Sequence, residues 1–124
     1  MDISKKIHIF AVNGNMNYKI KIGEIVKIRH NDISQDDRCF DRNYIIAHIK
    51  KKPVQISSRY FETKCSFLID FNGVFSYGMN VTTGINNNCS IEKLTMDDYN
   101  EIDSFLTENN LIFNKRSKKL KKIN

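Results

Sequence analysis

The most constraining feature of the sequence is a period-two alternation of apolar and polar residues on both sides of Asn72-Gly73. Such a pattern places successive side chains on opposite faces of a strand and predicts a hairpin over residues 65–79. A two-residue loop would mix the faces, whereas a three-residue loop, residues 71–73, pairs Asp70 with Val74. We favour the longer loop because Asp suits the first position of a type I turn and Gly73 can adopt positive φ. This register gathers the following residues on one face: Cys65, Phe67, Ile69, Phe75, Tyr77 and Met79.

Further strands are predicted in the first half of the chain. The apolar run 7–12 stops at residues 13–15 (NGN) and alternation resumes over 17–22, which is typical of a hairpin. Alternation returns over 25–29 and 43–52, and Pro53 marks a strand end or a sheet edge. Residues 30–42 are polar and mixed in charge, which indicates a long surface loop or a short irregular helix.

The last third predicts one helix. Thr95 and Asp98 resemble a capping box, Leu94 and Tyr99 fit a hydrophobic staple, and helical spacing continues to residues 109–110. Residues 81–90 are predicted to be a loop, residues 111–113 a final strand, and residues 115–124 a basic tail with Leu120 and Ile123 as anchors. The expected fold is a single α+β domain, residues 1–124, with a mostly antiparallel sheet of about six or seven strands, in an order left open, and one main C-terminal helix.

Composition narrows the class of protein. A chain of 124 residues, 40% of them hydrophobic, fits one domain with one core. No apolar window approaches a membrane span and no signal peptide is evident, so we expect a cytoplasmic protein. Cys39, Cys65 and Cys89 are odd in number and widely spaced, which argues against disulfides and structural zinc and favours reduced thiols, with Cys65 in the core. No phosphate-binding Gly-rich loop, dinucleotide fingerprint or nucleophile elbow is present, so neither a cofactor nor a metal is predicted.

Charge is distributed unevenly along the chain. Residues 1–60 contain 12 Lys or Arg and 6 Asp or Glu, and residues 61–90 contain 1 and 2. Residues 91–114 contain 1 Lys or Arg and 6 Asp or Glu, and residues 115–124 contain 6 and 0. These differences add to the formal net charge of +6. A basic first half and a basic end flank an acidic segment, as expected if one surface meets a polyanion and another does not.

The basic residues form the principal candidate site. Alternation predicts that Tyr18, Ile20 and Ile22 face the core together with Val26 and Ile28. Four cations should then project outward on one sheet face: Lys19, Lys21, Lys27 and Arg29. Such an array could neutralise phosphates, with Tyr18 or Tyr44 available for base stacking. The competing interpretation is a solvated sheet face in a lysine-biased protein. The predicted nucleic-acid-binding residues are Lys19, Lys21, Lys27, Arg29, His48, Lys50, Lys51, Lys52, Lys115, Arg116, Lys118, Lys119, Lys121 and Lys122.

The sequence offers five other candidate sites. His8, His30 or His48 could serve a metal-independent ribonuclease as general acid and base, although their spacing does not single them out. A hydrolytic or metal site could be built from His30, Asp32, Asp36, Asp37, Cys39 and Asp41, but these residues lack the order of a cation-binding loop. Cys39 or Cys89 could act as a nucleophile only with a histidine nearby. The Asn-rich loop 86–88 could line a nucleotide or small-ligand pocket. The predicted helix is acidic, with Asp97, Asp98, Glu101, Asp103 and Glu108. The helix dipole accounts for the acidic residues of the first turn, and a protein-docking face is the alternative explanation.

The abundance of Asn, Ile and Lys and the basic ending KRSKKLKKIN are typical of small accessory proteins encoded by phages and mobile elements of low-GC bacteria. The chain resembles this class, which includes anti-CRISPR proteins. The resemblance implies a non-enzymatic binder of host or defence machinery in a bacterial cytoplasm. The uneven charge then leads us to expect RNA or a ribonucleoprotein effector, such as an RNA-guided nuclease, as the partner. The resemblance transfers no functional residue and leaves the oligomeric state open.

Overall fold

The computed structural model describes residues 20–30, 40–84 and 89–123. The strands in these segments are β1 (Ile25–His30), β2 (Tyr44–Ile49), β3 (Val54–Gln55), β4 (Tyr60–Ile69), β5 (Phe75–Tyr77), β6 (Asn80–Gly84), β7 (Cys89–Glu92), β8 (Leu111–Asn114) and β9 (Lys119–Lys122). The helix is α2 (Met96–Glu108). The predicted hairpin over 7–22 lies almost wholly outside the described residues, and its last residues, Ile20–Ile22, belong to a loop and turn rather than a strand.

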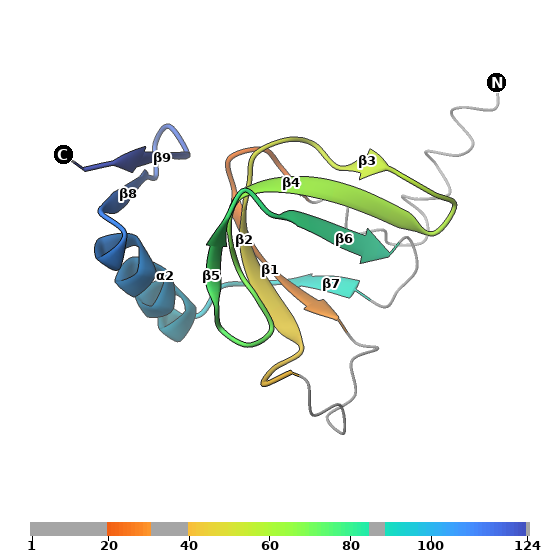
Figure 1. Cartoon of the computed structure of the whole chain (residues 1–124), viewed down its shortest axis with the longest axis horizontal. Helices are drawn as coiled ribbons and strands as arrows, with labels where there is room; N and C mark the ends of the chain where they lie inside the picture. The colour runs from red at the N-terminus through yellow and green to blue at the C-terminus, as the bar shows by residue number, and fades with distance from the viewer. Residues whose placement is uncertain (1–19, 31–39, 85–88, 124) are drawn as a thin grey trace.

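The main sheet has seven strands, and every pairing within the described residues is antiparallel. Its order is β3-β4-β2-β1-β7, with β5 and β6 also paired to β4. Strands β8 and β9 form a separate two-stranded sheet after α2, so the helix is not the last element (Figure 1). The α+β class and the mostly antiparallel sheet are confirmed.

The predicted register of the β4–β5 hairpin is confirmed. Ile69 pairs with Phe75, the Asp70 N–H donates to the Val74 carbonyl at 3.0 Å, and Gly73 has φ of +75°. The same register continues into β6, where Lys64 pairs with Asn80. The loop predicted over 81–90 is therefore wrong for residues 81–84, because β4 extends back to Tyr60 and offers a partner to β6. It is also wrong for residues 89–90, which begin β7 and pair with β1.

Each side of the main sheet carries a core cluster. One core cluster, with Ile28, Ala47 and Cys65, lies on the side that the curled sheet encloses. A second cluster, with Ile46 and Phe67, lies under α2 and the β8–β9 sheet. A bulge where β2 pairs with β4 at His48/Ile49 separates Cys65 from Phe67, so the prediction that these two share a face is wrong.

The helix begins as predicted. The Asp98 N–H donates to the Thr95 hydroxyl, and the Thr95 N–H donates to the Asp98 carboxylate at 2.8 Å, which completes the capping box. The basic end of the chain is a folded hairpin rather than a tail, since β9 pairs with β8 and Leu120 packs against the second core. Nowhere in the described residues does a helix combine the length and apolar character needed to cross a membrane.

Candidate nucleic-acid interface

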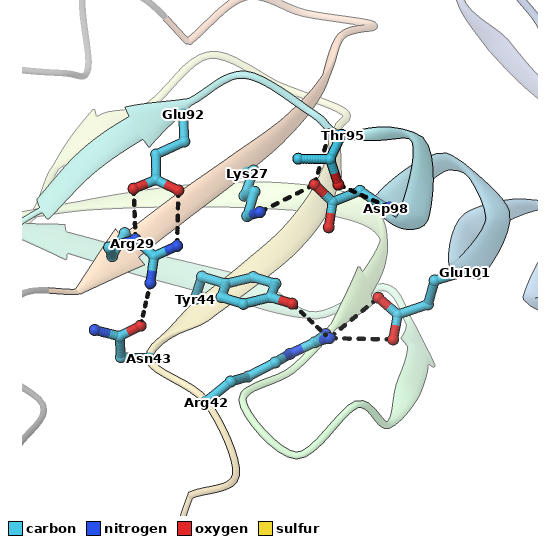
Figure 2. Close-up of polar contacts among 9 residues, drawn as sticks. All are labelled: Lys27, Arg29, Arg42, Asn43, Tyr44, Glu92, Thr95, Asp98 and Glu101. Carbon is cyan, nitrogen blue, oxygen red and sulfur yellow. Dashed lines mark hydrogen bonds and ion pairs between the residues drawn. The ribbon is translucent and has the colours of Figure 1, made fainter. Parts of the chain in front are cut away.

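Lys27 is buried beneath the helix. Its ammonium lies 3.0 Å from an Asp98 carboxylate oxygen, and the two side chains are only 8% and 5% exposed. Burial raises the pKa of Asp98, but hydrogen bonds from Thr95 and Lys27 outweigh it, so the net pKa is lowered. The carboxylate that caps α2 is therefore also the counterion of a lysine on β1 (Figure 2).

Arg29 is engaged in the same way at the sheet edge. Its guanidinium grips the Glu92 carboxylate through two nitrogens, one of them 2.8 Å from the oxygen it contacts, and also donates to the Asn43 side chain. The hydrogen bonding between Arg29 and Glu92 raises the pKa of Arg29 and lowers that of Glu92. A bidentate pair of this kind leaves the arginine little capacity to bind a phosphate.

Tyr44 lies among three cations. The Lys27 ammonium and the Arg42 guanidinium are each 4.4 Å from the ring centroid, and Arg29 is 5.2 Å away. Arg42 also donates to the Tyr44 hydroxyl and bridges to Glu101 of α2 at 3.1 Å (Figure 2). Tyr44 is thus an internal part of the helix-to-sheet contact and not a platform for bases.

The prediction that Lys27 and Arg29 project outward as free cations is therefore wrong, because each is paired with a carboxylate. Alternation had correctly placed both on the side opposite Val26 and Ile28, but that side is where α2 docks. Lys19 and Tyr18 lie outside the described residues, and Lys21 is exposed.

His48 also departs from its predicted role. It is only 4% exposed, its ring stacks on Phe67 and meets the edge of Phe113, and its Nε2 lies 3.1 Å from the Lys118 carbonyl oxygen. The side chain therefore holds the β8–β9 hairpin on the sheet instead of extending a basic surface.

The turn of that hairpin is fixed in position. The Asn114 side-chain oxygen accepts hydrogen bonds from the Arg116 and Ser117 N–H groups, and Lys118 adopts a left-handed φ of +56°. Lys118 also pairs with Glu24, and a Cβ on Gly23 would lie 2.8 Å from the Lys118 Cβ. The close approach requires glycine, which itself has φ of +87°.

Backbone contacts bring the exposed cations to one end of the molecule. The Gly23 N–H donates to the Ile49 carbonyl, and the Lys50 and Lys51 N–H groups both donate to the Lys64 carbonyl. Together with the Lys118 contacts, these bonds join segments 20–24, 49–53 and 114–119 and position 64, where the only carboxylate is Glu24. We call this set of exposed residues the basic end: Lys21, Lys50, Lys51, Lys52, Lys64, Lys115, Arg116, Lys118 and Lys119.

The remaining candidates receive little support. No group of three or more His, Cys, Asp or Glu side chains is placed to hold a metal within the part of the chain that the structure describes. Cys39, His8 and residues 86–88 lie outside that part. Cys65 is buried, which raises its pKa to about 11, and Cys89 lies 3.5 Å from the His30 Nδ1 but is itself buried. A pocket of about 610 Å³ lies between α2, the start of β1 and the β8–β9 hairpin. Its lining combines apolar side chains such as Leu106 and Phe113 with the charged side chains of Glu24, Asp103, Lys115 and Lys118.

Comparisons with known proteins add no assignment: no family model, curated protein or solved structure matches this chain.

Proposed function

We propose that the protein is a non-enzymatic binding protein that engages RNA, free or within an RNA–protein complex, through its basic end. The observation that supports this is the separation of two kinds of cation. Carboxylates neutralise Lys27 and Arg42 at the helix-to-sheet contact and Arg29 where β1 pairs with β7. The cations of the basic end are exposed, and within the described residues Lys118 alone among them forms an ion pair, with Glu24.

The proposal follows from the energetics of phosphate binding. Cations that are already ion-paired release no counterion when a polyanion arrives, but unpaired exposed cations do, and this release supplies most sequence-independent affinity. The hairpin turn is held by His48, Glu24 and Asn114, so its cations are presented on an ordered element. An ordered cationic surface loses less conformational entropy on binding than a free tail.

RNA affinity measured across a salt series tests the proposal. Fluorescence anisotropy with a labelled oligoribonucleotide should show log K falling linearly with log salt, with a slope of about −0.7 for each phosphate contact with a single strand. Replacing Lys50, Lys64 and Lys119 by Gln should reduce the magnitude of the slope by about 0.7 per lost contact and weaken binding.

The matched control lowers net charge elsewhere. Lys93, Asn100 and Ser104 are exposed on or next to α2, so Lys93→Gln with Asn100→Asp and Ser104→Asp lowers the total charge by three, as the triple variant does, without touching the basic end. The control should bind almost as the natural sequence does. Equal losses in both variants would mean that only net charge matters, and salt-independent or absent binding would overturn the proposal. Adding a candidate RNA-guided nuclease tests whether the bound RNA belongs to such an effector.

A further inference from the structure

Part of the main sheet lies beyond the reach of α2. Over the first half of β4, Thr63 and Cys65 point into the first core, so Tyr60, Glu62 and Lys64 point to the other side. Their partners on β6 are Gly84, Thr82 and Asn80, and directly paired residues share a face. Tyr60, Lys64, Asn80 and Thr82 are exposed.

Tyr77 extends this surface where β4 bends. It pairs with Phe67, which lies across the bulge on the same side as Lys64, and its ring is 52% exposed. The edge contact between Tyr77 and Phe75, with 5.1 Å between the ring centroids, holds the ring in place. The open face is defined as Tyr60, Glu62, Lys64, Tyr77, Asn80 and Thr82.

We propose that the open face binds unpaired bases of single-stranded RNA, with Tyr60 and Tyr77 as the stacking platforms. This inference rests on the proposed function and names its substrate class. Lys64 belongs to both the open face and the basic end, so the two surfaces are continuous. Tyr60 and the Tyr77 partner Phe67 are seven residues apart on β4, which is at most about 23 Å at 3.3 Å per residue because the strand bends at the bulge between them. This span leaves room for more than one nucleotide.

The chemistry of the face favours single strands over duplexes. Bases in a duplex are stacked on one another and offer no free ring face, whereas unpaired bases stack on exposed tyrosines. The amide and hydroxyl groups of Asn80 and Thr82 can hydrogen-bond base edges or the 2′-OH. Glu62 is the one carboxylate on the open face, and its charge repels phosphate. We therefore expect the sugar-phosphate backbone of the RNA to lie closer to Lys64 than to Glu62.

The experiment compares a labelled 12-nucleotide oligouridylate with an RNA duplex of equal length. Tyr60→Leu and Tyr77→Leu should each weaken binding of the single strand about 5- to 150-fold, the equivalent of roughly 1–3 kcal/mol per stacked base. Duplex binding should be unchanged. Tyr77→Phe should retain affinity because the ring remains, and Glu62→Gln should strengthen binding.

The matched control is Tyr99→Leu, since Tyr99 is comparably exposed, at 43%, but lies on α2. It should bind as the natural sequence does. The chain contains no tryptophan, so quenching of the intrinsic tyrosine emission by the oligonucleotide gives a second readout of stacking. If salt-dependent binding persists but the tyrosine variants bind normally, or if the duplex binds equally well, this inference is overturned while the proposed function stands. If the natural sequence binds no RNA, both fail.

Discussion

Removal of the Lys27 ammonium tests the central structural finding, that this lysine of the sheet is neutralised by a carboxylate of α2. In Lys27→Met, the Asp98 carboxylate stays buried with only its capping bonds, and in Asp98→Asn the ammonium stays buried without a counterion. Loss of one partner of a buried pair costs about 3–5 kcal/mol. We expect about 3 kcal/mol for each variant, because Thr95 still bonds residue 98 and the Tyr44 ring still faces Lys27.

The double variant Lys27→Met with Asp98→Asn should lose no more than either single variant, because neither charge is then left unpaired. The coupling energy is therefore about 3 kcal/mol. Urea unfolding followed by circular dichroism gives the free energy of unfolding of the natural sequence, the two single variants and the double variant. In thermal melting, each single variant should have a Tm about 12 °C lower, at roughly 4 °C per kcal/mol for a protein of this size. Lys93→Met, at an exposed lysine, is the control and should stay within about 0.5 kcal/mol. Losses that simply add, or a Lys27→Met protein as stable as the control, would refute the pairing.

The same pair gives a pH dependence. The folded-state pKa of Asp98 is lowered, so its stabilising contribution is present above the ordinary value of about 3.9 and is lost as pH falls through the folded-state pKa. Asp98→Asn should therefore lose less stability than the natural sequence when pH falls from about 5 to 3. An unchanged acid-unfolding profile would contradict the lowered pKa.

Three further predictions concern other described contacts. Gly23→Ala should destabilise the protein by about 1–2 kcal/mol, through its positive φ and its contact with Lys118, and thermal melting checks this. Asn114→Ala should cost about 1 kcal/mol by removing two turn hydrogen bonds, and hydrogen exchange of the β8–β9 amides should rise. The Cys65 thiol, buried and with its pKa raised to about 11, should resist alkylation at pH 8 until the chain unfolds, and labelling before unfolding would show the burial to be wrong.

Local features of the sequence predicted local structure well. The β4–β5 register follows from alternation plus the turn preferences of Asp70 and Gly73, all within fifteen residues. The capping box at Thr95 and Asp98 is likewise a matter of neighbouring residues. The strand at 80–84 was missed because Thr and Asn carry little apolar pattern there, and its pairing depends on the length of β4.

The sequence by itself determined which residues of β1 and β2 share a face, because alternation fixes the side of the sheet to which each side chain points. Only the tertiary structure decided whether that side meets water or a helix. The carboxylates that neutralise Lys27, Arg29 and Arg42 are 71, 63 and 59 residues away, beyond the reach of any local pattern. Long basic side chains can either extend into solvent or bury their stems, and what decides between these is the packing of a distant element. For the same reason, the exposed cations and tyrosines of the candidate site became visible only once the helix had been placed.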